Sequence, residues 1–193
     1  MLFFATGSSG SGKTACLPAL ARLLPTLAIH DFDEVGVPSN PDIRWRQATT
    51  EHWIQTYCER YQVTGGHMLI SGGVVFGEIH AAPSISLVDA WHACLLDCDD
   101  VVRVERLRQR GTYGPNMDIL CWAAWLRVHA VDPTWCPEVI QTESHPMMRW
   151  DRMARYTRCD PQWSQHRIDT SHQTIEETAA AIARGIQELL RQR

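Results

Sequence analysis

The sequence predicts a three-layer α/β fold in which a central parallel sheet of about five strands is flanked by helices. Short apolar runs alternate with segments of helical periodicity along the chain, as is typical of parallel strands joined by helical crossovers. The length of 193 residues also suits one hydrophobic core better than two. We therefore expect a single domain over residues 1–193, with a helical region at about 36–66 and a helical insertion at about 111–164.

Composition narrows the class of protein. The formal net charge is -4, so the surface as a whole does not favour nucleic acid. No apolar run approaches the roughly 20 residues of a membrane helix, and the first residues lack the basic leader of a signal peptide. The seven cysteines are odd in number and irregularly spaced, which argues against a disulfide framework and a zinc site. We expect a cytoplasmic protein that binds neither nucleic acid nor a membrane.

The first strand is expected at residues 2–5, and a glycine-rich loop follows it. The loop reads Gly7, Ser8, Ser9, Gly10, Ser11, Gly12, Lys13 and Thr14. It matches G-x-x-x-x-G-K-[ST] in full and lies between the strand and a predicted helix at about 13–24. The alternative, a chance serine- and glycine-rich loop, is weaker because Lys13 is the single lysine among 18 basic residues.

Each part of this loop has a role toward a nucleoside triphosphate. The backbone N–H groups of such a loop face phosphate oxygens. Lys13 would reach the β- and γ-phosphates, and the Thr14 hydroxyl would bind Mg²⁺. The motif therefore predicts a P-loop that binds ATP or GTP together with Mg²⁺.

Two carboxylates follow the second strand, which is expected at residues 27–30. Asp31 and Asp33 alternate around Phe32, so an extended segment places both on the same side. Ligands of open α/β folds bind at this end of the strands. Phosphoryl transfer needs a carboxylate to orient the acceptor and oxygen ligands for the metal, and these two aspartates can divide that work. The alternative is that they solvate a loop or cap the next helix.

The middle of the chain predicts a helix at about 45–61 and strands at 67–71 and 93–96. Gly72 and Gly73 end the first of these strands. The second leads through Asp99, a predicted N-cap, into an arginine-rich helix.

Arg103, Arg106 and Arg110 share one face of that helix at three- and four-residue spacing. Such a row can clamp phosphates during transfer. For Arg103, a solvated position balanced by Glu105 is the alternative.

The segment at 111–164 has helical patterns at about 118–130 and 147–157. Trp122 and Trp125 lie three residues apart, and we expect them in a small helical core. The alternative is an aromatic wall for a large, flat acceptor. A last strand is expected at 167–169, and we expect Asp169 and Thr170, at and just after its end, near the purine of the nucleotide.

The last segment of the sequence predicts an amphipathic helix. Thr174 and Glu177 form a capping box that opens this helix.

The phosphate loop, the Asp31-x-Asp33 pair, the Gly72-Gly73 pair and the Arg106-Leu107-x-x-Arg110 sequence together resemble the shikimate kinase and gluconate kinase group of P-loop kinases. Chloramphenicol phosphotransferase shares the wider fold. The resemblance implies that Asp33 is the base beside the acceptor hydroxyl and that Asp31 assists Mg²⁺. It also implies that the glycine pair lines the acceptor site and that Arg106 and Arg110 cover the nucleotide phosphates from a lid.

Arg44 and Arg46 stand where related kinases place arginines that bind the acceptor. The Phe-Arg-x-x-Glu pattern of shikimate kinases is not reproduced around them, which argues against shikimate itself.

We therefore predict a phosphotransferase that moves the γ-phosphoryl group of a nucleoside triphosphate to a hydroxyl of a small molecule. The long aromatic insertion favours an antibiotic or another natural product, with a role in self-resistance. Nucleoside, nucleotide and central-metabolite kinases remain alternatives. A P-loop switch is a weaker one, because its Asn-Lys-x-Asp motif cannot occur in a chain whose single lysine is Lys13. We expect a monomer or a homodimer whose partners are the nucleotide and the acceptor.

Overall fold

The computed structural model describes residues 1–111, 114–163 and 165–192. Five parallel strands form one sheet in the order β2-β3-β1-β4-β5, which confirms the predicted parallel sheet. The strands are β1 (Leu2–Thr6), β2 (Ala28–Asp31), β3 (Met68–Ser71), β4 (Trp91–Asp97) and β5 (His166–Asp169).

Seven α-helices are assigned within the described residues. They are α1 (Lys13–Leu23), α2 (Ile43–Tyr57), α3 (Phe76–Ala81), α4 (Asp100–Arg110), α5 (Met117–His129), α6 (Glu138–Gln141) and α7 (Ile175–Arg191). The capping box of α7 forms as predicted, with Glu177 N donating to Thr174 Oγ1 at 3.2 Å and Thr174 N donating to Glu177 Oε2 at 2.8 Å. α3 and the 3-10 turn Pro83–Leu87 were not predicted.

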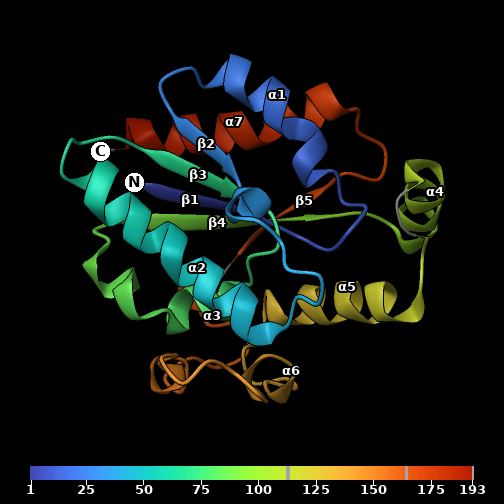
Figure 1. The fold of residues 1–193 in the computed structure, drawn as a ribbon. Helices are drawn as coiled ribbons and strands as arrows, with labels where there is room; N and C mark the ends of the chain where they lie inside the picture. The colour runs from blue at the N-terminus through green and yellow to red at the C-terminus, as the bar shows by residue number, and fades with distance from the viewer. Residues whose placement is uncertain (112–113, 164, 193) are drawn as a thin grey trace.

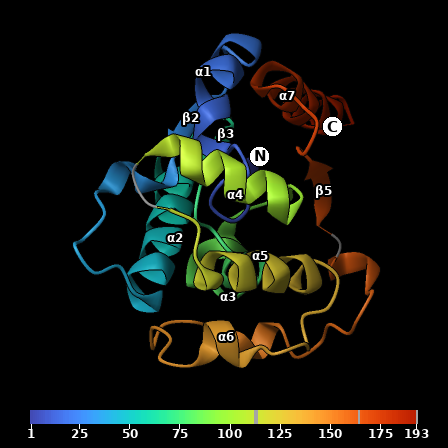
Figure 2. The ribbon, with the colours of Figure 1, turned by 90° about the vertical axis from the view of Figure 1, so that its right-hand side faces the viewer.

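The sheet is the middle of three layers. Along β1, Phe3 and Ala5 pack with residues of α1 and α7. Leu2 and Phe4 point to the other face, where they pack with α2 and α3. α1 and α7 thus cover one face of the sheet, and α2, α3 and α5 cover the other (Figures 1 and 2).

The predicted insertion supplies much of the packing below the sheet. In α5, Trp125 and Leu126 are buried in a cluster with Val75 and with Leu95 of β4. Trp163 is fully buried and donates its indole N–H to the carbonyl oxygen of His129 at 2.7 Å. α6 lies farther from the sheet, beneath α3 and α5 (Figure 1). Residues of the predicted insertion at 111–164 thus contribute to the hydrophobic core of the domain.

Several connections that carry the predicted site residues meet at one edge of the sheet. β1 runs into the phosphate loop, β2 into Asp31 and Asp33, and β3 into Gly72. α4 stands across this edge, as Figure 2 shows.

Candidate functional site

The phosphate loop owes its shape to glycines in conformations that other residues rarely adopt. Gly7, Gly10 and Gly12 have φ angles of 147°, 81° and 97°. A Cβ atom on Gly7 would lie 2.3 Å from the carbonyl oxygen of Leu96, so this position also requires a close backbone approach. Gly12 then serves as the N-cap of α1.

Hydrogen bonds from the body of the protein hold three carbonyl groups of the loop. Arg103 Nη1 donates to Ser9 O at 2.8 Å, and Arg106 Nη1 donates to Gly10 O at 3.3 Å. Thr170 Oγ1 donates to Ser11 O at 3.1 Å. Arg106 Nη2 also donates to Thr170 O at 2.6 Å, so α4 and the end of β5 support the loop together.

Arg103 is fully buried, and neither alternative predicted for it is correct. Its Nη2 pairs with Asp97 Oδ1 at 2.6 Å. The other oxygen of Asp97 accepts from Arg127 Nε at 2.7 Å and lies 2.8 Å from Arg167 Nη2. Three arginines thus converge on one buried carboxylate at the end of β4, directly behind the loop.

Lys13 is half-buried and lies against its own loop. Its Nζ donates to Gly7 O at 2.6 Å and to Ser8 O at 3.0 Å. Burial lowers the pKa of Lys13 to about 8, and the positive charge of Arg103 acts in the same direction, while Asp31 and Asp33 partly oppose both.

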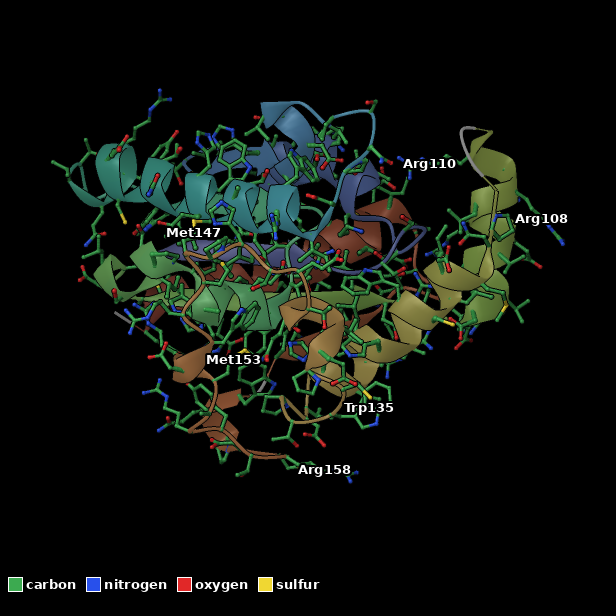
Figure 3. The ribbon with its side chains drawn as sticks, turned by 60° about the horizontal axis from the view of Figure 1, so that its bottom comes forward. Arg108, Arg110, Trp135, Met147, Met153 and Arg158 are labelled. Carbon is green, nitrogen blue, oxygen red and sulfur yellow. The ribbon has the colours of Figure 1, made fainter. Side chains whose placement is uncertain are left out.

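A cavity of about 760 Å³ opens above the loop and brings together most of the predicted site residues. The predicted residues that line it are Gly7, Ser9, Gly10, Ser11, Gly12, Lys13, Thr14, Asp31, Asp33, Gly72, Gly73, Arg106, Arg110 and Thr170. They come from four connections of the sheet, at the ends of β1, β2, β3 and β5, and from α4. Arg110 extends from α4 toward the loop, whereas Arg108 points away from it (Figure 3).

Asp31 and Asp33 lie on a tight turn, the 3-10 helix Phe32–Val35. Asp31 Oδ1 accepts from Asp33 N at 3.0 Å, and Glu34 Oε1 accepts from Asp31 N at 2.9 Å. Asp31 therefore caps the turn and also faces the cavity. Partial burial and the neighbouring Asp31 carboxylate raise the pKa of Asp33, against the opposing effect of Lys13 and Arg110.

Gly72 lets this turn pack against the end of β3. A Cβ atom on Gly72 would lie 2.2 Å from Cβ of Phe32. The indole N–H of Trp53 donates to Phe32 O at 3.1 Å from the side of α2. The position of Asp33 thus depends on contacts of its neighbour Phe32.

Four predicted site residues are not among those that line the cavity. Arg44 is exposed and donates through Nε to Glu143 O at 3.0 Å. Arg46 forms a bidentate ion pair with Glu78, at 2.9 Å from Nε and 2.7 Å from Nη2.

The other two are Ser8 and Asp169, whose polar atoms have partners elsewhere. Ser8 Oγ donates to Ile119 O at 3.3 Å. The Asp169 carboxylate accepts from the N–H and hydroxyl of Ser171.

Eight further residues of the cavity are not among the predicted site residues. They are Ala15, Cys16, Leu107, Trp122, Gln173, Thr174, Ile175 and Thr178. Thr174 and Ile175 are readable from the sequence as the start of α7, but the place of that start beside α1 depends on the tertiary fold. Trp122 reaches the cavity from α5, three residues before the buried Trp125.

The donor set of the cavity suits a hard cation. The Thr14 hydroxyl and the carboxylates of Asp31 and Asp33 supply oxygen ligands, which Mg²⁺ prefers. Within the described ranges, no group of three or more histidine, cysteine, aspartate or glutamate side chains could hold a metal by itself. Nor does the described part of the chain contain a helix with the length and apolar character needed to span a membrane.

No protein-family model matches the sequence, and a search of curated proteins finds no match. Solved structures do match over nearly the whole chain. A sugar kinase from Janibacter sp. HTCC2649 is 13% identical with a TM-score of 0.58, over 96% of this chain and 94% of that chain.

Two other matches have comparable coverage. The tunicamycin resistance protein of Deinococcus radiodurans is 15% identical with a TM-score of 0.56, over 96% of this chain and 94% of that one. A gluconokinase from Sinorhizobium meliloti 1021 is 16% identical with a TM-score of 0.52, over 98% and 95% of the two chains. The chain thus has the fold of P-loop small-molecule kinases, and the predicted resemblance to that group is confirmed at the level of the fold.

Proposed function

We propose that this protein is a phosphotransferase that moves the γ-phosphoryl group of ATP or GTP to a hydroxyl group of a small molecule. The observation that carries the proposal is one cavity lined both by Lys13, Thr14 and the glycines of the loop and by Asp31 and Asp33. A phosphate-binding loop facing a carboxylate is what phosphoryl transfer to a hydroxyl requires.

Each residue has a role in this proposal. Asp33 orients the acceptor hydroxyl, whose oxygen forms the new bond to the γ-phosphorus, and takes its proton late in the transfer. The bond from that phosphorus to the bridging oxygen breaks, and the nucleoside diphosphate leaves. Lys13, Arg106 and Arg110 stabilise the negative charge that shifts among the phosphate oxygens. Thr14 and Asp31 would hold Mg²⁺, which offsets phosphate charge when bound.

The nucleotide base would lie near Thr170, at the end of β5. Gln173 and Thr178, on either side of the start of α7, also line the cavity. Asp169 is a weaker candidate for this role, because its carboxylate accepts two hydrogen bonds from Ser171.

We further propose that the acceptor is an antibiotic or another natural product and that the protein acts in the cytoplasm, as a monomer or a homodimer, in self-resistance. The tryptophan of α5 beside the cavity supports a large acceptor. The similarity in fold to a tunicamycin resistance protein is consistent with this role. Similarity to a sugar kinase and a gluconokinase favours the second candidate, a kinase of a nucleoside or a central metabolite.

An acceptor screen by mass spectrometry tests the proposal. The purified protein is incubated with Mg²⁺, a panel of hydroxyl compounds and either ATP or GTP, and each compound is examined for a gain of about 80 Da, the mass of HPO₃. We expect at least one compound to gain this mass with one of the two nucleotides. Nucleotide hydrolysis without a phosphorylated acceptor would contradict the proposal.

A further inference from the structure

The cavity residues that follow β2 and β3, together with Trp122 of α5, form what we call the acceptor side: Asp31, Asp33, Gly72, Gly73 and Trp122. It contains two carboxylates and an aromatic ring. Among the described residues that line the whole cavity, the cations are Lys13, Arg106 and Arg110. Lys13 and Arg106 contact the loop itself, so these charges lie where a nucleotide would place its phosphates.

Arg46 lies against Trp122 of the acceptor side, and a carboxylate already neutralises it. Its guanidinium carbon lies 5.0 Å from the ring centroid of Trp122. Glu78, which is completely buried, accepts two hydrogen bonds from it. Gln47 Nε2 donates to Glu78 Oε1 at 3.2 Å and fixes the carboxylate further. An isolated cation here would attract an anionic acceptor, but a neutral, bidentate pair does not.

Arg44 does not provide a cation for an anionic acceptor either. It is exposed on the first turn of α2 and donates to the backbone carbonyl of Glu143, and neither residue is among those that line the cavity. Both arginines that could have bound an acid group on the acceptor therefore have other partners.

The Trp122 ring is held rigidly in place. It stacks on Trp125, with ring centroids 5.2 Å apart and an angle of 10° between the planes. Trp125 in turn stacks on the buried His129 at 4.3 Å. With Trp125 and Arg46 both against its ring, Trp122 holds a fixed position in the cavity wall, so an acceptor that contacts it pays little to order this side chain.

We infer that the acceptor is a molecule without a carboxylate or phosphate group that packs an apolar part against Trp122 and places a hydroxyl at Asp33. An anionic acceptor would have to leave water beside two aspartates. Arg46 is already paired with Glu78, and Arg110, whose charge acts on both Asp33 and Lys13, is assigned by the proposed function to the phosphates of the nucleotide. This inference rests on the proposed function, whose acceptor class it specifies.

Matched pairs of probes test the inference by binding. Uridine is compared with uridine 5′-monophosphate, and methyl shikimate with shikimate, each against protein saturated with ADP. The readout is the indole N–H signal of Trp122 in ¹⁵N NMR spectra, assigned as the signal missing from Trp122→Phe. We expect the neutral member of each pair to shift this signal with at least about tenfold higher affinity than its anionic counterpart.

Glu78→Gln provides the charge control, because it leaves Arg46 without its counter-charge. The anionic probes should gain at least about tenfold in affinity in this variant. If the Glu78→Gln variant does not fold, the double variant Arg46→Gln with Glu78→Gln serves as the charge control instead. The double variant should bind the neutral probes as the wild type does and should give the anionic probes no gain.

Anionic probes that bind the wild type as tightly as their neutral counterparts would overturn the inference. So would neutral probes that leave the Trp122 signal unmoved at millimolar concentration. The outcome is separate from that of the proposed function. Phosphorylation of anionic acceptors alone would refute the neutral acceptor and support the proposed kinase activity. Binding of neutral probes without any phosphoryl transfer would support the neutral acceptor and refute the kinase activity.

Discussion

Arg103 and Asp97 form a buried ion pair, with 2.6 Å between Nη2 and Oδ1, directly behind the phosphate loop. The same guanidinium donates to the carbonyl oxygen of Ser9. The pair therefore links the end of β4 to the loop that would bind the nucleotide, and the shape of that loop depends on a charge network below it.

Replacing Asp97 should destabilise the protein strongly. Asp97→Asn leaves the buried Arg103 with only the longer, 3.5 Å contact of its Nε with Asp100 Oδ1, and breaking a buried pair in this way costs about 3–5 kcal/mol. Urea unfolding measures the loss. Asp151→Asn is the matched control, because Asp151 pairs with Arg149 on the surface and its side chain is 63% exposed. That change should cost no more than about 1 kcal/mol, and equal losses in the two variants would contradict the assigned role of Asp97.

Replacing Lys13 should weaken binding of the nucleoside triphosphate. Lys13→Met removes a charged donor, and hydrogen bonds to charged groups contribute about 1.5–3 kcal/mol. Affinity for ATP or GTP should fall roughly 10- to 150-fold, as titration calorimetry can measure. Arg22→Met, at an exposed cation in the last turn of the same helix, should leave the affinity unchanged. An unchanged affinity in Lys13→Met would refute the phosphate-binding role.

The buried His129 should make the protein sensitive to acid. Burial and the nearby His80 lower the pKa of His129 from 6.5 to about 3. The unfolded chain therefore binds more protons than the folded chain between these two values, so stability is lost as the pH falls below 6.5.

A variant isolates this effect. His129→Gln keeps an acceptor for the N–H of Gly77, which now donates to Nε2 at 3.1 Å. The slope of unfolding free energy against pH should become shallower by up to about 1.4 kcal/mol per pH unit over this range. His52→Gln, at an exposed histidine, should not change the slope, and a slope equally steep in wild type and His129→Gln would contradict the prediction.

Gly72→Ala should impair turnover more than nucleotide binding. The new methyl group would meet Phe32 Cβ at 2.2 Å and displace the turn that carries Asp33, while the phosphate loop keeps its own contacts. We expect kcat to fall at least about tenfold with the Kd for nucleotide little changed, since small displacements of catalytic groups are costly. Gly185→Ala in α7, where a Cβ meets nothing within 4 Å, is the control and should behave as the wild type.

The order of strands and helices along the chain could be predicted because the motifs, the apolar periodicity and the capping residues indicated the same elements. The loop from Gly7 to Thr14 predicts a strand before it and a helix after it, and the Thr174 capping box predicts the start of α7. Residues that depend on these signals alone, such as Lys13, line the cavity as expected.

The charge pairs could not be predicted in the same way. Asp97 and Arg167 are 70 residues apart in sequence and meet only because β5 pairs with β4. Arg46 looked available for an acceptor because α3, which supplies Glu78, has too short a helical pattern to be recognised. Pairing across the fold, rather than residue type, decides which arginines remain for a ligand.

The most direct test of the central claim separates phosphoryl transfer from nucleotide binding at Asp33. In Asp33→Asn the carboxylate that faces the loop becomes an amide of the same shape. Transfer should fall about 10²- to 10⁴-fold, the usual contribution of a general base, while the Kd for ATP or GTP stays within about twofold. Asp42→Asn is the control, because asparagine retains the N-cap of α2 that Asp42 provides through Trp45 N. Retained transfer in Asp33→Asn, with Asp31→Asn inactive, would assign the base to Asp31, and retained transfer in both variants would contradict the account.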